Sequence, residues 1–133
     1  MATWLTALTD DARRALGGDQ RVLEHLPFKV GRESRVGPSA RRTDERRKGT
    51  GPQLNDIYIV ETGEVVNVSR EHFLIDADGA GFVLVDRAST LGTIVEGRSI
   101  GGDRTGGRTP LRTYDVIIVG TAASPFVFKF RTG

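Results

Sequence analysis

Residues 68–76 bring together more side chains capable of chemistry than any other short stretch of this sequence, which reads VSREHFLID there. Ser69, His72 and Asp76 supply the residue types of a nucleophile, a base and an orienting acid, the set that a serine hydrolase uses. In an extended strand, however, residues 69 and 72 point to opposite faces, and no Gly-x-Ser-x-Gly elbow is present. We therefore predict that the chain is not an enzyme and has no catalytic residue here.

The same segment suits the binding of an anion. The hydroxyl of Ser69 and the guanidinium of Arg70 can both donate hydrogen bonds to a phosphate, the arginine through a planar fork that makes two parallel charge-assisted bonds. Neither residue has to be buried for this role. The segment alone leaves two interpretations open, a phosphate-binding corner between two strands and an ordinary surface turn.

The composition excludes several other kinds of site. The 133 residues suit one domain with its own core, and the chain has no cysteine and only two histidines. Disulfides, thiolate chemistry and zinc sites built from cysteine or several histidines are therefore ruled out, and we expect no metal and no cofactor. The first residues lack the pattern of a secretion signal and no run of 18 apolar residues occurs, so we expect a cytoplasmic protein without a membrane partner.

Positive charge is concentrated between residues 32 and 48, where seven basic residues stand against three acidic ones although the whole chain has a net charge of only +2. Such an excess attracts anionic partners and weakens with salt. It fits either a solvated surface loop or a contact with nucleic acid. We disfavour nucleic acid as a partner because few aromatic residues, which normally stack on bases, lie near this segment.

The first half of the chain is predicted to contain a helix, a strand and a long loop. Residues 3–17 read as one short helix, in which Thr9 caps the segment DDARRAL and two glycines end it. Residues 21–30 alternate between apolar and polar side chains, which predicts a single strand with Pro27 at an edge or a bulge. Residues 33–52 are polar and rich in arginine, glycine and proline, so we expect a disordered or mobile loop there.

The second half consists of short segments of β-branched and aromatic residues separated by Gly, Asp, Asn, Ser or Thr. No helical stretch of 10–15 residues separates them, which excludes a parallel βαβ sheet and predicts an antiparallel sandwich or barrel. The glycine-rich residues 101–108 lack the Lys-Ser/Thr pair of a phosphate loop, so we interpret them as a hairpin connection. The predicted strands are residues 56–60, 71–76, 81–86, 92–97, 114–120 and 125–132.

Three separated segments give a more specific prediction: KVGRESR at 29–35, VSREHF at 68–73 and DRASTLGTIVEG at 86–97. In order and spacing they resemble the forkhead-associated (FHA) domain, whose pattern is Gly-Arg, then Ser-Arg-x-His, then Asp-x-x-Ser-x-Asn-Gly-Thr-x-Val-x-Gly. The resemblance implies an all-β antiparallel sandwich of about eleven strands whose loops at one end bind phosphothreonine. We accordingly expect a short helical extension at residues 1–19 and an FHA-like domain at residues 20–133.

The resemblance also implies roles for individual residues. Those expected to contact the phosphate are Arg32, Ser69, Arg70 and Thr90. Those expected to support the loops are Gly31, His72 and Gly92. Leu91 stands where the family usually has an asparagine that hydrogen-bonds the ligand backbone, and a leucine side chain can neither donate nor accept such a bond. The leucine either retunes peptide selectivity through an apolar contact or removes the dependence on phosphate.

The function that the resemblance implies is recognition of a phosphothreonine-containing partner protein, recruited after phosphorylation by a Ser/Thr kinase. Two alternatives stay open. One is assembly with a partner that needs no phosphate, which Leu91 favours, and the other is the nucleic-acid contact at residues 32–48. A further hypothesis is that Thr6 or Thr9 is phosphorylated in a tail that folds back into the domain's own site.

Overall fold

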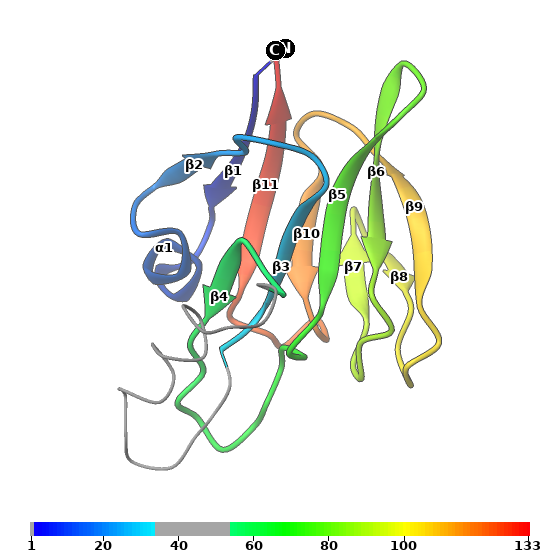
Figure 1. The fold of residues 1–133 in the computed structure, drawn as a ribbon. Helices are drawn as coiled ribbons and strands as arrows, with labels where there is room; N and C mark the ends of the chain where they lie inside the picture. Colours follow the sequence, from blue (N-terminus) through cyan, green and yellow to red (C-terminus); the bar gives the residue numbers. More distant parts are fainter. Residues whose placement is uncertain (1, 34–53) are drawn as a thin grey trace.

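The computed structural model describes residues 2–33 and 54–133. These residues contain eleven strands and one helix, and the strands form two sheets that face each other (Figure 1). The six-stranded sheet contains β1 (Thr3–Ala7), β2 (Gln20–Val22), β7 (Thr93–Val95), β8 (Arg98–Ile100), β10 (Val116–Val119) and β11 (Val127–Thr132). The five-stranded sheet contains β3 (Phe28–Arg32), β4 (Ile57–Ile59), β5 (Phe73–Asp78), β6 (Gly81–Asp86) and β9 (Gly107–Leu111).

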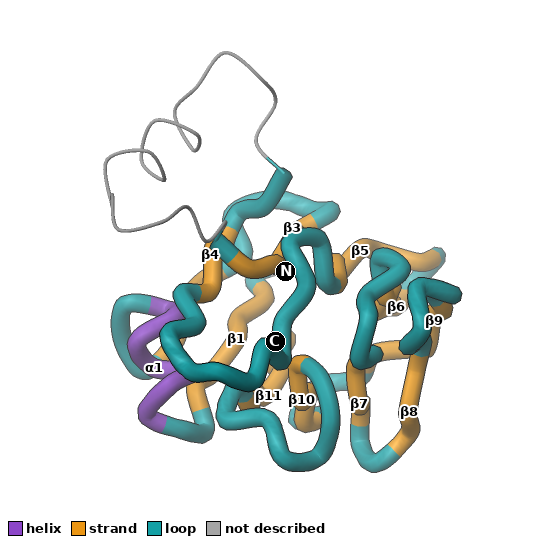
Figure 2. The backbone as a smooth tube through the Cα atoms, turned by 90° about the horizontal axis from the view of Figure 1, so that it is seen from below, coloured by secondary structure: helices purple, strands orange, loops and turns teal. Residues whose placement is uncertain are grey.

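The two sheets are the two layers of a sandwich, which Figure 2 shows end-on. The strand order is β2-β1-β11-β10-β7-β8 in one layer and β4-β3-β5-β6-β9 in the other, and β3 and β4 are paired in parallel. Large apolar side chains fill the space between the layers, and their removal from water drives folding. Among them Phe28, Phe73, Phe128 and Phe130 are at most 1% exposed. The predicted all-β sandwich of about eleven strands with a short helix is confirmed.

The N-terminal segment differs from the prediction because only its second part is helical. Residues 3–17 do not form one helix, since Thr3–Ala7 is strand β1, which pairs with β2 on one side and β11 on the other. Alternate residues of β1 are buried, the period of two that a strand requires. The helix α1 (Asp10–Leu16) then begins as expected, because the side chain of Thr9 accepts a hydrogen bond from the N–H of Ala12 at 3.1 Å.

The helix α1 lies at one edge of the sandwich beside β1 and β4 (Figure 2). In the described part of the chain, no helix is both long enough and apolar enough to cross a membrane.

Thr6 and Thr9 are not part of a free tail. Thr6 lies within β1, opposite Lys129 of β11. Thr9 caps the helix and also donates its hydroxyl hydrogen to the carbonyl of Pro125 at 2.5 Å. These bonds hold both threonines on the body of the domain, which contradicts the hypothesis of a phosphorylated tail that folds back.

The predicted single strand at residues 21–30 is wrong, because this segment crosses from one sheet to the other. Its first residues belong to β2 and its last residues to β3, which lie in different layers. Between them Leu23 points into the core while Glu24 is exposed, so the alternation breaks at the crossing. The Leu26–Pro27 peptide bond, just before β3, is cis.

The predicted hairpin at residues 101–108 is also wrong. β8 pairs with β7 in the six-stranded sheet, whereas β9 pairs with β6 in the five-stranded sheet. The loop between β8 and β9 therefore joins the two layers. The sequence gives little sign of either strand, because β8 has only three residues and β9 contains Gly107 and Pro110, which are rare inside strands.

Both ends of the chain lie together at one end of the sandwich, where the N–H of Gly133 donates to the carbonyl of Ala2 at 3.2 Å (Figure 1). The loops that precede β5, β7 and β9 lie at the opposite end (Figure 1). The predicted loop at residues 33–52 lies outside the described residues except for Glu33, and so do the basic residues beyond Arg32 that a nucleic-acid contact would use.

Candidate functional site

A buried carboxylate fixes the segment that precedes Ser69. Glu61 follows strand β4 and is only 8% exposed. Its carboxylate accepts hydrogen bonds from the backbone N–H of Val68 at 2.6 Å and from that of Asn67 at 2.9 Å. A carboxylate is tolerated at such depth only where donors of this kind surround it. These bonds therefore tie residues 67 and 68 to the end of β4 and set the position of Ser69.

Ser69 joins three of the loops at this end of the sandwich. Its carbonyl accepts a hydrogen bond from the N–H of Arg32 at 2.8 Å, and its hydroxyl oxygen accepts one from the N–H of Thr90 at 2.9 Å. A hydroxyl that accepts one hydrogen bond still has a hydrogen to donate to an anion. Arg32, Ser69 and Thr90, which are far apart in the sequence, are thus brought into one corner.

The side chain of Arg32 lies along the same loop. Its Nε donates to the carbonyl of Val68 at 2.9 Å and its Nη1 donates to the carbonyl of Glu33 at 3.3 Å. The residue is half-buried, and a guanidinium stays protonated at physiological pH. A fixed positive charge therefore lies beside the residue that precedes Ser69.

Arg70 supplies a second positive charge, at the surface. Its side chain is exposed, and among the described residues no hydrogen bond or ion pair holds its guanidinium. Its backbone is fixed instead, because the carbonyl of Arg70 accepts a hydrogen bond from Nδ2 of Asn55 at 2.7 Å. The donors of Arg70 face solvent beside Ser69, where an anion can reach them.

Gly31 lies directly beneath this carbonyl. A Cβ atom at Gly31 would lie 2.1 Å from the carbonyl oxygen of Arg70 and 2.6 Å from Nδ2 of Asn55. Atoms that are not bonded do not approach so closely, since optimal contacts are about 3.5 Å or more. Only glycine therefore lets the Ser69–Arg70 loop pack this tightly on β3.

Arg87 holds Asn55 in place, and both residues were missed by the sequence analysis. Nη1 of Arg87 donates to Oδ1 of Asn55 at 2.6 Å, and Nη2 donates to the carboxylate of Glu71 at 2.9 Å. Partial burial lowers the pKa of Arg87 below its usual value, and the charge of Glu71 opposes that shift. Asn55 is itself 2% exposed, so its amide is a buried polar group with both ends bonded. The arginine thus clamps residue 55 to the loop at residues 70–71.

His72 braces two loops from inside the domain. It is fully buried; Nδ1 accepts a hydrogen bond from the N–H of Ser69 at 2.9 Å, and Nε2 donates to the carbonyl of Gly92 at 2.7 Å. Burial lowers the pKa of His72, and the bond to Gly92 opposes the shift. Both contacts need the neutral ring with its hydrogen on Nε2, since a proton on Nδ1 would face the Ser69 N–H.

The same geometry argues against a catalytic triad of Ser69, His72 and Asp76. The histidine contacts the backbone of Ser69 rather than its hydroxyl, which instead accepts a bond from the N–H of Thr90. The carboxylate of Asp76 accepts a bond from the N–H of Ala77. A general base must reach the hydroxyl that it deprotonates, and His72 is directed elsewhere.

A second buried carboxylate builds the loop that carries Thr90. Asp86 at the end of β6 is 3% exposed and accepts hydrogen bonds from the N–H and the hydroxyl of Ser89 at 2.9 and 2.7 Å and from the hydroxyl of Thr93 at 2.8 Å. The hydroxyl of Ser89 in turn accepts a bond from the N–H of Gly92 at 2.9 Å. No role was predicted for Asp86 and Ser89, although the Asp-x-x-Ser spacing is the signal for this turn.

Leu91 and Gly92 form the tip of that loop. Gly92 has φ 83°, and a Cβ there would lie 2.9 Å from the carbonyl oxygen of Ile100, so only glycine fits. Leu91 is 38% exposed, a large fraction for an aliphatic side chain. It lies next to Thr90 in the corner and offers a ligand an apolar contact in place of a hydrogen bond.

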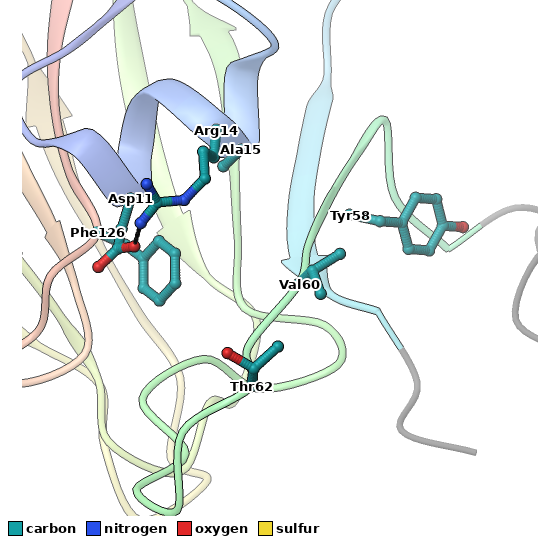
Figure 3. A pocket seen from close by; sticks show the side chains of 7 residues that line it. All are labelled: Asp11, Arg14, Ala15, Tyr58, Val60, Thr62 and Phe126. Carbon is teal, nitrogen blue, oxygen red and sulfur yellow. Dashed lines mark hydrogen bonds and ion pairs between the residues drawn. The ribbon is translucent and has the colours of Figure 1, made fainter. Parts of the chain in front are cut away.

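A separate pocket of about 240 Å³ lies between α1 and β4 (Figure 3). None of the predicted site residues lines it, and its two charged side chains, Asp11 and Arg14, are paired with each other. In the described residues no group of three or more histidine, aspartate or glutamate side chains is arranged to hold a metal ion. The corner of Ser69 is therefore the candidate functional site.

Comparison with known families identifies the family to which the chain belongs. The family model for the FHA domain matches residues 29–120, a span that includes each predicted site residue and more than half of the chain. The chain belongs to the FHA domain family. FHA domains are interaction modules rather than enzymes. A comparison with curated proteins gives no match.

Solved FHA domains share this architecture over nearly the whole chain. The FHA domain of the CT664 protein from Chlamydia trachomatis is 20% identical, covers 100% of this chain and 99% of its own, and has a TM-score of 0.62. The kinase-interacting FHA domain of the kinase associated protein phosphatase of Arabidopsis is 25% identical, with coverage of 98% and 92% and a TM-score of 0.61. EmbR of Mycobacterium tuberculosis, solved in complex with a low affinity phosphopeptide, is 20% identical, with coverage of 98% and 24% and a TM-score of 0.56.

Proposed function

We propose that this FHA domain binds phosphothreonine in partner proteins and that it recruits proteins phosphorylated by a Ser/Thr kinase. The observation that carries the proposal is the corner in which the hydroxyl of Ser69, the N–H of Thr90 and the backbone of Arg32 meet, with Arg70 exposed beside them. Solved relatives support it, because one was studied for phosphothreonine-dependent FHA domain interactions and EmbR was solved with a phosphopeptide.

The chemistry of the corner suits a phosphate dianion. Arg70 offers a fork of N–H donors, Ser69 offers a hydroxyl hydrogen, and Arg32 adds a positive charge nearby. The buried Asn55 and His72 hold the backbones of Arg70 and Ser69 before a ligand arrives, and the N–H of Arg32 is bonded to Ser69, so binding costs little ordering of the site. Loss of one charged donor should cost about 2 kcal/mol, or roughly 30-fold in affinity.

In this proposal the domain performs no chemistry on the bound segment and needs no cofactor. Its buried polar groups are used to hold loops: Glu61 holds residues 67–68, Asp86 holds residues 89–93, and His72 connects the two. The partner would be a protein segment whose threonine has been phosphorylated, and the domain would act as a reader of that modification.

Fluorescence anisotropy with labelled peptides tests the proposal. A degenerate phosphothreonine library, its phosphoserine equivalent and its unphosphorylated equivalent would be titrated with the wild type, Ser69→Ala and Arg70→Gln. Ser99→Ala on β8 and Arg112→Gln at the opposite end of the sandwich are matched controls, because both residues are exposed. We expect binding that requires phosphate, is weakened by the two site variants and is unchanged in the controls. Equal binding of phosphorylated and unphosphorylated libraries would reject the proposal.

The exposed Leu91 favours a second candidate function, assembly with a partner that carries no phosphate. An aliphatic side chain at the tip of the loop gains from being covered by a partner, whether or not phosphate is present. In the same assay this function predicts binding that survives Ser69→Ala and Arg70→Gln but is lost in Leu91→Asp.

A further inference from the structure

The loop between β8 and β9 lies along the loop that carries Thr90. The N–H of Asp103 donates to the carbonyl of Thr90 at 2.8 Å, and the N–H of Arg104 donates to the carbonyl of Ser89 at 3.0 Å. A Cβ placed on Gly102 would lie 3.9 Å from the carbonyl carbon of Leu91. The two segments therefore run antiparallel, with residue 102 beside Leu91, residue 103 beside Thr90 and residue 104 beside Ser89.

The backbone of this second loop is held in an unusual conformation. Residues 101–104 all have positive φ, with values of 71°, 98°, 52° and 61°, although Asp103 and Arg104 are not glycine. A left-handed conformation costs about 1–2 kcal/mol for such residues and persists where the surrounding structure enforces it, often at functional sites. Here Gly101 packs on the carboxylate of Asp86, since a Cβ at Gly101 would lie 2.5 Å from it. The same buried carboxylate thus supports both loops.

The side chains of Asp103 and Arg104 on this loop are charged, and no described residue pairs with either of them. Asp103 and Arg104 are exposed, and within residues 2–33 and 54–133 neither side chain makes a hydrogen bond or an ion pair. Exposed arginines on this domain are often paired, as Arg13 is with Asp10 and Asp19. An unpaired guanidinium on a rigid support can pair with a ligand without first breaking another contact.

We propose that Arg104 selects, among phosphothreonine segments, those with an aspartate or glutamate close to the phosphothreonine, on the side of the peptide that passes Leu91. This inference rests on the proposed function. Leu91 lies beside residue 102, two residues before Arg104 on the same loop. A segment that contacts Leu91 would therefore be near the positive charge of Arg104, which attracts a carboxylate. Asp103, beside Thr90, carries the opposite charge close to the phosphate and should weaken the binding of every phosphopeptide.

A double-mutant cycle tests the inference. Phosphothreonine peptides selected from the library would be compared with versions in which each acidic residue is replaced by its amide, against the wild type, Arg104→Gln and the charge-matched control Arg112→Gln. For an exposed arginine and carboxylate we expect Arg104→Gln to weaken the acidic peptide about threefold to fivefold and to leave the amide version unchanged. The preference should shrink as salt is added, and Asp103→Asn should strengthen both peptides.

Equal weakening of both peptides by Arg104→Gln, or no weakening, would overturn the inference, because neither result assigns Arg104 to a flanking carboxylate. The wild type's binding of the amide peptide tests the proposed function separately. If that binding requires phosphate, the proposed function stands whatever Arg104 does. If it is absent or indifferent to phosphate, both the proposed function and this inference fail.

Discussion

Gly31→Ala is the substitution that tests most sharply how the fold builds the site. The new methyl group would lie 2.1 Å from the carbonyl oxygen of Arg70 and 2.6 Å from Nδ2 of Asn55. To restore an ordinary contact near 3.5 Å, the carbonyl would have to move by about 1.4 Å. The amide that bonds it at 2.7 Å would have to move as well, so this hydrogen bond should be lost.

The expected loss of stability follows from the hydrogen-bonding groups that would lose their partners. Loss of the bond costs about 1 kcal/mol, and a buried amide donor left without a partner costs roughly 1–3 kcal/mol more. Asn55 is 2% exposed, so water cannot easily replace the lost partner. Alanine has less conformational entropy than glycine in the unfolded chain, which offsets roughly 0.5–1 kcal/mol of this loss. We therefore expect Gly31→Ala to lower the free energy of unfolding by about 2 kcal/mol and to displace Arg70 from the corner.

Urea denaturation measures the first effect and the peptide titration measures the second. Gly18→Ala is the matched control, because a Cβ at Gly18 has nothing within 4 Å. The control should be as stable as the wild type and should bind equally well. If Gly31→Ala unfolds at the same urea concentration as Gly18→Ala and binds with wild-type affinity, then the Arg70 carbonyl does not pack on β3 as described.

Three further predictions concern His72, Asp86 and Leu91. Burial lowers the pKa of His72 below its usual value of about 6.5, so at lower pH the unfolded chain binds more protons than the folded one. The wild type should therefore lose stability relative to His72→Gln as the pH falls below about 6.5, and should lose none above it. Urea midpoints of the two proteins that stay parallel from about pH 7.5 to 5.5 would contradict this. Asp86→Asn should lower the free energy of unfolding by roughly 1–3 kcal/mol, because an amide replaces one acceptor oxygen of the Ser89 turn, whereas exposed Asp78→Asn should change it little. Leu91→Asn should raise phosphopeptide affinity by up to about tenfold by adding a hydrogen bond to the ligand backbone, and a decrease would show that the leucine makes a useful apolar contact.

The strands that could be predicted are those whose own side chains specify a face. In β11 and the residue that precedes it, Phe126, Phe128 and Phe130 occupy alternate positions and so indicate the inward face, and all three are at most 5% exposed. Strand β1 was missed because its short alternation is followed at once by the capping residue of α1, so one helical pattern covered both. Its pairing with β11 is a contact across almost the whole chain, which local sequence cannot supply.

The topology of the crossings was unpredictable for a related reason. Residues 21–30 and 101–108 each contain signals for strands and turns, but those signals do not say to which sheet a strand belongs. Sheet membership is decided by which long-range partner buries the strand's apolar face, and that partner is set by the other strands. Both segments consequently change layers where a single strand or a hairpin was expected.

The residues of the candidate site were easier to predict than the groups that hold them. Ser69 and Arg70 have chemistry that suggests an anion. Asn55, Glu61 and Arg87 instead act through hydrogen bonds to residues 15, 7 and 32 positions away in the sequence. A buried polar side chain is stabilised only by hydrogen-bond partners that folding brings next to it. Such partners are invisible in a sequence without the three-dimensional arrangement.

The most direct test of the proposed function is nuclear magnetic resonance of the ¹⁵N-labelled domain during titration with a phosphothreonine peptide and with its unphosphorylated equivalent. The account predicts that the backbone amide signals of Arg32, Ser69, Arg70 and Thr90 shift with the phosphorylated peptide and stay in place with the other. Equal shifts with both peptides, or shifts confined to residues such as Val60 at the pocket between α1 and β4, would contradict the assignment of the phosphate to the corner of Ser69.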